Sequence, residues 1–229
     1  MTTAVYFDLD GTLCTYDESF ESLFRRAVSP HGTPTDAAYE AYVERLLTAL
    51  DRCEPDPYRR GFETVAEEID LDATPAALAA DYCDIEVDAT VVTADAKRVL
   101  DTVAATNPTG IITNGDGEQQ RAKLEFHGLD DRVDEVLVSN SNGVRKPDRE
   151  LFELAKARLD ADEFVYVGDS YDEDIVGARE AGFRTVYVDG GSIAAEDAAA
   201  ADGIVSSVGE LLDDDSLPAA LEGPFASQA

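Results

Sequence analysis

The residues best suited to chemistry stand in a short run near the start of the chain, residues 4–12, AVYFDLDGT. Its apolar half is typical of a buried parallel strand, which would place Asp8 at the carboxyl end, where open α/β sheets bind ligands. Side chains alternate along a strand, so Asp8 and Asp10 can share a side while Leu9 enters the core. Gly11 permits a sharp turn. Two such carboxylates suit a nucleophile and a general acid/base, with a cation to offset their charge. The alternative is an acidic turn that only closes a strand.

Three later segments also place polar side chains at the end of an apolar strand or near the start of a helix. They are residues 110–115 (GIITNG), 145–148 (RKPD) and 164–174 (FVYVGDSYDED). The polar groups that they contribute are Thr113, Asn114, Lys146, Asp169 and Asp174. Pro147 follows the lysine at a position that helices accept in their first turn.

Together and in this order, the four segments resemble the four motifs of the haloacid dehalogenase superfamily of phosphohydrolases. The resemblance covers about residues 4–212 and is densest at the motifs themselves. It implies a Mg²⁺-dependent phosphatase that acts on a small phosphorylated metabolite.

The resemblance also implies a role for each polar group. Asp8 would be the nucleophile that forms an aspartyl-phosphate. Asp10 would protonate the leaving oxygen and then activate water. The Thr113 hydroxyl and the Asn114 backbone N–H would donate to phosphoryl oxygens, and Lys146 would neutralise charge.

Magnesium prefers oxygen ligands, and by resemblance they are the Asp8 carboxylate, the Asp10 backbone carbonyl and Asp169. Asp174 is either a further metal ligand or the partner that holds Lys146.

Three other functions are compatible with parts of this pattern. A 2-haloacid dehalogenase usually lacks an aspartate at the Asp10 position and needs no metal, so Asp10 favours phosphate chemistry. A phosphomutase would use the same residues with another cap and substrate. A non-catalytic acidic binding module would not need all four motifs. Many relatives carry a glutamate shortly before the lysine segment, but this chain has SNSNG at residues 139–143, and no catalytic role is assigned there.

Alternating patterns along the chain predict an α/β fold with a doubly wound, Rossmann-like parallel sheet. Beyond the first strand, strands are expected at residues 110–113, 135–138, 164–167 and 184–188. Helices are expected at residues 94–104, 119–127, 149–159 and 175–181, and Gly128 and Gly182 stand where helix C-terminal glycines belong. Residues 204–212 are expected to return to the core as a last strand and a short helix.

Residues 16–90 differ from this pattern and predict an inserted α-helical cap. Five prolines divide the segment into about four helices. Two apolar stripes at helical spacing are expected to form its core: Phe20, Leu23, Phe24 and Val28, then Tyr39, Tyr42, Val43, Leu46, Leu47 and Leu50. The catalytic core would then comprise residues 1–15 and 91–212, and residues 213–229 would form an acidic, flexible tail.

The charge of the chain excludes several partners. It has 49 acidic and 18 basic residues and a formal net charge of −31, which opposes binding to nucleic acid and to anionic membranes. Only four lysines are present: Lys97, Lys123, Lys146 and Lys156. This composition resembles that of proteins from halophilic archaea; a mesophilic acidic protein is the alternative.

Three cysteines without metal-ligand spacing favour reduced thiols in a cytoplasmic protein, and the chain has no apolar run of membrane-spanning length. Cys14 is expected to pack in the core. Arg52, Arg59 and Arg60, with Tyr58, could reach an anionic substrate, or the arginines could pair with nearby acids.

Overall fold

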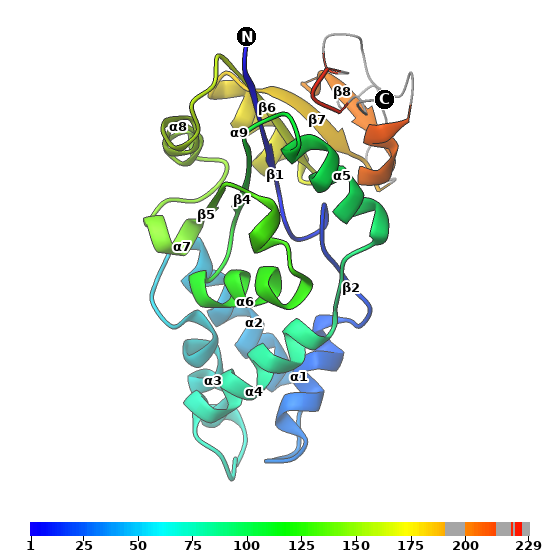
Figure 1. Cartoon of the computed structure of the whole chain (residues 1–229). Helices are drawn as coiled ribbons and strands as arrows, with labels where there is room; N and C mark the ends of the chain where they lie inside the picture. Colours follow the sequence, from blue (N-terminus) through cyan, green and yellow to red (C-terminus); the bar gives the residue numbers. More distant parts are fainter. Residues whose placement is uncertain (191–199, 214–220, 222, 226–229) are drawn as a thin grey trace.

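The centre of the molecule is a parallel β-sheet. The computed structural model describes residues 1–190, 200–213, 221 and 223–225, and six of its strands form one sheet in the order β5-β4-β1-β6-β7-β8 (Figure 1). These strands are β1 (Thr3–Phe7), β4 (Thr109–Thr113), β5 (Glu135–Val138), β6 (Glu163–Gly168), β7 (Arg184–Val188) and β8 (Gly203–Val205). All neighbouring pairs are parallel, and Phe7 of β1 stands opposite both Ile111 of β4 and Val167 of β6.

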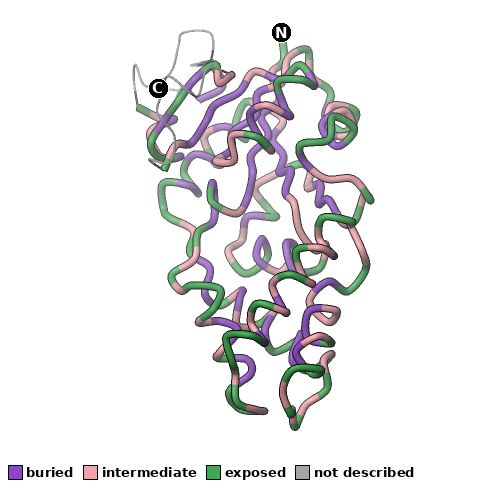
Figure 2. Tube along the Cα trace, turned by 180° about the vertical axis from the view of Figure 1, so that it is seen from behind, coloured by how far each residue is buried: buried purple, intermediate pink, exposed green. Residues whose placement is uncertain are grey.

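Helices cover both faces of this sheet, because its strands are apolar on both sides. Along β1, Val5 and Phe7 pack into one core cluster, whereas Ala4 and Tyr6 pack into another. The helices of this layer are α5 (Ala94–Ala104), α6 (Gly117–His127), α7 (Ser139–Asn142), α8 (Arg149–Arg158) and α9 (Gly177–Glu180). Side chains of α5 and α6 join the first cluster, and those of α8 and α9 join the second. Buried residues follow the sheet strands in Figure 2. The expected doubly wound α/β fold is confirmed.

Four helices form a separate layer, called the cap below. They are α1 (Phe20–Val28), α2 (Asp36–Asp51), α3 (Pro57–Glu68) and α4 (Pro75–Asp88). Their apolar side chains make a core of their own. Ser19, Thr35 and Thr74 cap three of these helices by accepting a backbone N–H three residues later. A two-stranded antiparallel ribbon, β2 (Thr15–Tyr16) with β3 (Thr90–Val91), connects the cap to the sheet layer (Figure 1).

Two residues of the expected cap core lie on its surface. Phe20 is 49% exposed and Leu47 is 53% exposed, whereas Phe24 and Tyr42 are buried. Helical spacing identifies one face of a helix, but the width of the face that is covered depends on the neighbouring helices.

Near the site, two local expectations are wrong. Helix α8 begins at Arg149 with Asp148 as its N-cap, so Pro147 precedes the helix and does not lie in its first turn. In place of one helix over residues 175–181, a wide π-helical turn, η2 (Tyr171–Val176), precedes the short helix α9. Ser170 precedes this turn as its N-cap, and the Ser170 side chain accepts the Glu173 backbone N–H.

The C-terminal residues also differ in part from expectation. Short 3₁₀ turns are η1 (Asp130–Arg132), η3 (Val208–Leu212) and η4 (Gly223–Phe225), and β8 with η3 forms the expected last strand and short helix. Most of the predicted flexible tail lies outside the described residues. Leu221 and Phe225, however, are buried in the core cluster beside α5, so the tail is not solvated at these two positions.

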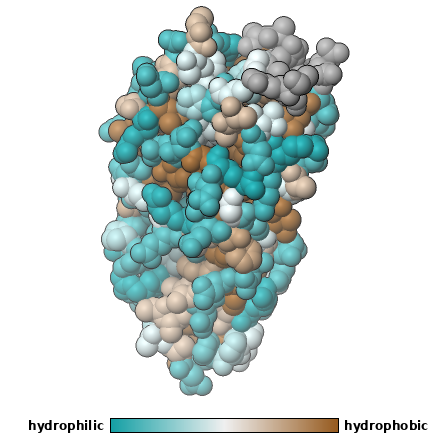
Figure 3. Space-filling model, viewed as in Figure 1, coloured by the Kyte–Doolittle hydropathy of each residue, from teal (hydrophilic) through white to brown (hydrophobic). Residues whose placement is uncertain are grey.

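The acidic residues of the described part lie almost entirely at the surface. Only Asp8, Glu86 and Asp174 are buried among them. The face in Figure 3 is accordingly mostly hydrophilic. No helix in the described part has both the length and the apolar character that a membrane crossing requires.

We expect the melting temperature of this protein to rise between about 0.1 and 2 M KCl. The Debye length falls from about 10 Å at 0.1 M to about 3 Å at 1 M, so salt screens the mutual repulsion of the surface carboxylates. The measurement is a series of thermal melts at fixed pH and fixed magnesium concentration. A melting temperature that stays level or falls over this range would show that the acidity is not an adaptation to salt.

Candidate active site

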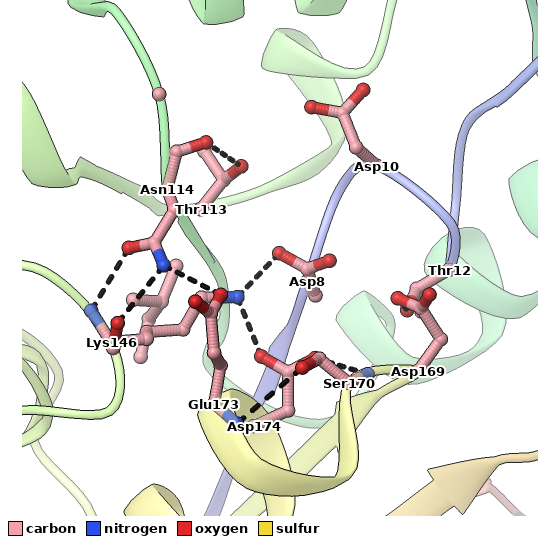
Figure 4. A network of polar contacts seen from close by, with 12 residues as sticks. Asp8, Asp10, Thr12, Thr113, Asn114, Lys146, Asp169, Ser170, Glu173 and Asp174 are labelled. Carbon is pink, nitrogen blue, oxygen red and sulfur yellow. Dashed lines mark hydrogen bonds and ion pairs between the residues drawn. The ribbon is translucent and has the colours of Figure 1, made fainter. Parts of the chain in front are cut away.

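The sequence motifs meet at one edge of the sheet because β4, β1 and β6 are neighbours. Asp8 directly follows β1, Thr113 is the last residue of β4, and Asp169 directly follows β6. Carboxyl ends of parallel strands lie at the same edge, so residues far apart in the sequence converge there. Lys146 and Asp174 approach the same point from the segments that precede α8 and α9 (Figure 4).

The centre of the site is the buried ammonium group of Lys146, which is only 2% exposed. Its Nζ donates to Asp8 Oδ1 and to Asp174 Oδ1 at 2.6 Å each, and lies 3.0 Å from the hydroxyl oxygen of Tyr166 (Figure 4). The two carboxylates therefore share one cation. Asp174 holds Lys146, which was one of its two expected roles.

A close contact with the backbone fixes the position of Asp174. Its Oδ2 accepts the backbone N–H of Ser170 at 2.9 Å. A Cβ on Gly168, the last residue of β6, would lie 2.4–2.6 Å from atoms of the Asp174 side chain. Only glycine at position 168 leaves room for the Asp174 carboxylate at the end of β6.

Three carboxylates form a cluster that could hold a metal ion. Each of Asp8, Asp169 and Asp174 offers one oxygen, and these oxygens lie within 4.8 Å of one another. The Thr12 hydroxyl donates to Asp169 Oδ1 at 3.0 Å. Gly11 has φ +93°, and a Cβ there would lie 2.2 Å from Asp169 Oδ2, so the turn after β1 is shaped around this carboxylate. A donor set made only of oxygens fits a hard cation such as Mg²⁺.

The electrostatics of this cluster also favour a cation. Burial raises the pKa of Asp8 well above its usual value and Asp174 adds to the rise, although Lys146 opposes it. Burial likewise raises the pKa of Asp169. Burial alone would lower the pKa of Lys146, but Asp174 and Asp8 outweigh it and the pKa rises. Three carboxylates around one ammonium leave excess negative charge, which a divalent cation would offset.

Asn114 makes contacts that the sequence did not predict, since only its backbone N–H had been given a role. Its Oδ1 accepts the Lys146 backbone N–H at 2.9 Å, and its Nδ2 donates to the Lys146 carbonyl at 3.1 Å. Nδ2 also donates to Glu173 Oε2 at 2.9 Å, and Glu173 Oε1 accepts from Arg145 at 2.7 Å. The side-chain amide of Asn114 therefore holds the backbone of Lys146 in place. No spacing in the sequence indicates such a contact.

The Asp10 carboxylate lies outside the acidic cluster, which leaves only its backbone carbonyl as the expected metal ligand. In Figure 4 the Asp10 side chain points away from Asp8, Lys146 and Asp174. Gln120 Nε2 donates to Asp10 Oδ2 and to the Thr113 hydroxyl, both at 2.7 Å. Thr113 in turn lies 3.3 Å from the Asn114 carbonyl.

Sequence reasoning missed the polar residues of α6, of the connecting ribbon and of the cap that form a network around Asp10. Tyr16, Gln120 and Lys123 contact Asp10 directly. Glu86 and Gln119 extend this network. The only sequence signal was the scarcity of lysine, which makes each of the four lysines worth examining.

The arginines at the start of cap helix α3 pair with nearby acids, which was the alternative to a role in substrate binding. Arg59 pairs with Asp56 and Glu63, and Arg60 lies 3.6 Å from Glu54. Cys14 is fully buried, and burial raises the pKa of its thiol to about 12, which agrees with a packing role.

Comparison with known proteins agrees with this geometry. The family model for haloacid dehalogenase-like hydrolases matches residues 2–182. The chain is 33% identical over 220 residues to the ribulose-1,5-bisphosphate 5-phosphatase of Halopiger xanaduensis, covering 82% of this chain and 85% of that protein. It is 28% identical over 195 residues to the pyrimidine 5′-nucleotidase YjjG of Escherichia coli, covering 80% and 84%. Among solved structures, a 2-haloacid dehalogenase from Pseudomonas syringae superimposes with a TM-score of 0.68 at 24% identity, covering 92% and 96% of the two chains, and shows the fold alone.

Fold and similarity define the class as a hydrolase with a Rossmann-like sheet and an aspartate-rich site at its carboxyl edge. The chain belongs to the haloacid dehalogenase-like hydrolase family. Its phosphatase relatives make it a phosphoric monoester hydrolase.

Proposed function

We propose that this protein is a Mg²⁺-dependent phosphatase that hydrolyses a small phosphorylated metabolite through an aspartyl-phosphate on Asp8. The observation that carries the proposal is the buried Lys146 ammonium, which lies 2.6 Å from both Asp8 and Asp174 beside Asp169. A carboxylate can attack an anionic phosphate only where fixed positive charge offsets the repulsion. This arrangement supplies one cation and the ligands for a second.

In the proposed first step, an oxygen of Asp8 attacks phosphorus, and the ester oxygen leaves with a proton from Asp10. In the second step, Asp10 accepts a proton from water, which attacks the aspartyl-phosphate, releases inorganic phosphate and restores Asp8. Lys146 neutralises charge on Asp8, while the Thr113 hydroxyl and the Asn114 backbone N–H donate to phosphoryl oxygens.

The metal would be held by the Asp8 and Asp169 carboxylates and by the Asp10 backbone carbonyl. When bound, Mg²⁺ supplies positive charge that stabilises the phosphoryl oxygens. Both oxygens of Asp174 already accept hydrogen bonds, Oδ1 from Lys146 and Oδ2 from Ser170, which favours its role as holder of the lysine over that of a direct ligand.

We also propose a salt-rich cytoplasm as the place of action. The three cysteines are free thiols, and the net charge of −31 would be screened there.

The test is a panel of phosphate monoesters with Mg²⁺ in molar KCl. The panel contains p-nitrophenyl phosphate, ribulose 1,5-bisphosphate, pyrimidine 5′-nucleotides and sugar monophosphates, with 2-chloropropionate as the control for carbon–halogen cleavage. We expect release of inorganic phosphate from at least one ester and no halide release. Phosphate moved between positions of a sugar without release would identify a mutase, and halide release alone would identify a dehalogenase; either result would contradict the proposal.

A further inference from the structure

A second buried lysine lies on the side of Asp10 that faces away from Asp8. Lys123 of α6 is 2% exposed, and its Nζ lies 3.1 and 3.2 Å from the two oxygens of Asp10. The same nitrogen lies 3.2 Å from Glu86 Oε1 and donates to the Tyr16 hydroxyl at 2.5 Å. Burying a strongly hydrated ammonium with its partners is costly, and apolar residues of similar volume often serve stability as well or better. The position of this group therefore calls for a functional reason.

The partners of Lys123 come from both layers of the molecule. Asp10 follows the central strand, whereas Glu86 belongs to cap helix α4 and Tyr16 to the connecting ribbon. Gln119 of α6 also donates to Glu86, with Nε2 3.0 Å from Oε2. In Figure 1, α6 lies between the sheet and the cap helices. One ammonium is thus shared by the proposed acid/base of the core and a carboxylate of the cap.

The donors around Asp10 fix the direction of its side chain. Lys123 donates to the carboxylate, Gln120 Nε2 donates to Oδ2 at 2.7 Å, and the Tyr16 hydroxyl lies 2.8 Å from Oδ1. The carboxylate consequently faces α6 and the connecting ribbon, and it points away from Lys146 and Asp174 (Figure 4). Because those two groups fill the sheet side of Asp8, the organic part of a bound ester has to lie on the cap side. Asp10 is therefore held on the side of the leaving oxygen.

We propose that Lys123 is a positioning residue, which acts through Asp10 and, together with Glu86 of the cap, orients Asp10 for proton transfer to the leaving group. The inference rests on the proposed phosphatase function. It gives a role in catalysis to a residue of α6 that lies outside the four sequence motifs. It also means that the cap contributes to proton transfer through the lysine that it shares with the core.

The test compares leaving groups in the variant Lys123→Met, which keeps the length of the side chain and removes its charge. An alkoxide such as that of glycerol phosphate needs a proton in order to leave, whereas p-nitrophenolate leaves without one. We expect Lys123→Met to lower kcat/KM for glycerol phosphate roughly tenfold or more beyond its effect on p-nitrophenyl phosphate. In an Asp10→Asn background, the same substitution should have almost no further effect on this ratio. The matched control is Lys156→Met in α8, whose Nζ contacts the Ala181 carbonyl far from Asp10 and which should leave the ratio unchanged.

Equal losses for both esters, or an undiminished effect in the Asp10→Asn background, would overturn this inference and leave the phosphatase proposal intact. A wild-type protein that hydrolyses no ester of the panel described above would refute the phosphatase proposal itself. If Lys123→Met does not fold by circular dichroism, Tyr16→Phe removes one hydroxyl contact to Asp10 and keeps the ring. Tyr16→Phe should then also lower kcat/KM for glycerol phosphate more than that for p-nitrophenyl phosphate, by a smaller factor than Lys123→Met. An unchanged ratio of the two kcat/KM values would count against the inference.

Discussion

Replacement of Asp8 by asparagine is expected to abolish turnover and to leave the fold intact. The amide has nearly the same size as the carboxylate and can still lie beside Lys146, but it is a poor nucleophile. Because Asp8 would form the covalent intermediate, the expected loss in kcat is about 10³-fold or more. The measurement is phosphate release from p-nitrophenyl phosphate, with a thermal melt to confirm folding.

The matched control for this change is Asp131→Asn, an exposed aspartate in η1, which removes the same charge at a distance from the site. It should keep near wild-type activity. An Asp8→Asn protein that retained more than about a tenth of the wild-type rate would be incompatible with Asp8 as the nucleophile.

Removal of divalent cations is expected to eliminate activity as completely as the Asp8→Asn substitution does. The clustered carboxylates of Asp8, Asp169 and Asp174 have only the Lys146 ammonium among them. Without a metal ion, the site therefore lacks the positive charge that would offset these carboxylates and the phosphoryl group. After dialysis against EDTA, hydrolysis of p-nitrophenyl phosphate should fall to background and return on addition of Mg²⁺. Full activity in excess chelator would contradict the proposal, and zinc as the best activator would count against this all-oxygen donor set.

A second readout of the same prediction does not depend on activity. Mg²⁺ that binds only the folded protein should raise its melting temperature in a concentration-dependent way. Asp169→Asn removes the charge of one proposed ligand and should shift this dependence to higher Mg²⁺ concentrations. Asp131→Asn, measured in parallel, should follow the wild-type curve.

The sequence by itself determined the class of fold and the residues that meet at the sheet edge. Apolar strands that end in Asp8, Thr113 and Asp169 specify a parallel sheet, because alternating strands and helices can bury both faces in few other ways. Once these strands are neighbours, their ends converge without further information. Gly128, with φ +65°, could be recognised for a similar local reason, since glycine readily adopts the left-handed conformation at the end of α6.

Only the tertiary structure decided how the side chains around these strand ends are partnered. Lys123 and Glu86 are 37 residues apart, and they meet because the cap helix α4 lies against α6. Likewise, Asn114 contacts Lys146 through side-chain geometry that leaves no periodic trace in the sequence. Burial of Leu221 and exposure of Phe20 and Leu47 depend on which surfaces other segments cover. Local pattern specifies an element and its apolar face, whereas long-range packing specifies the partner of each charge and the extent of each buried face.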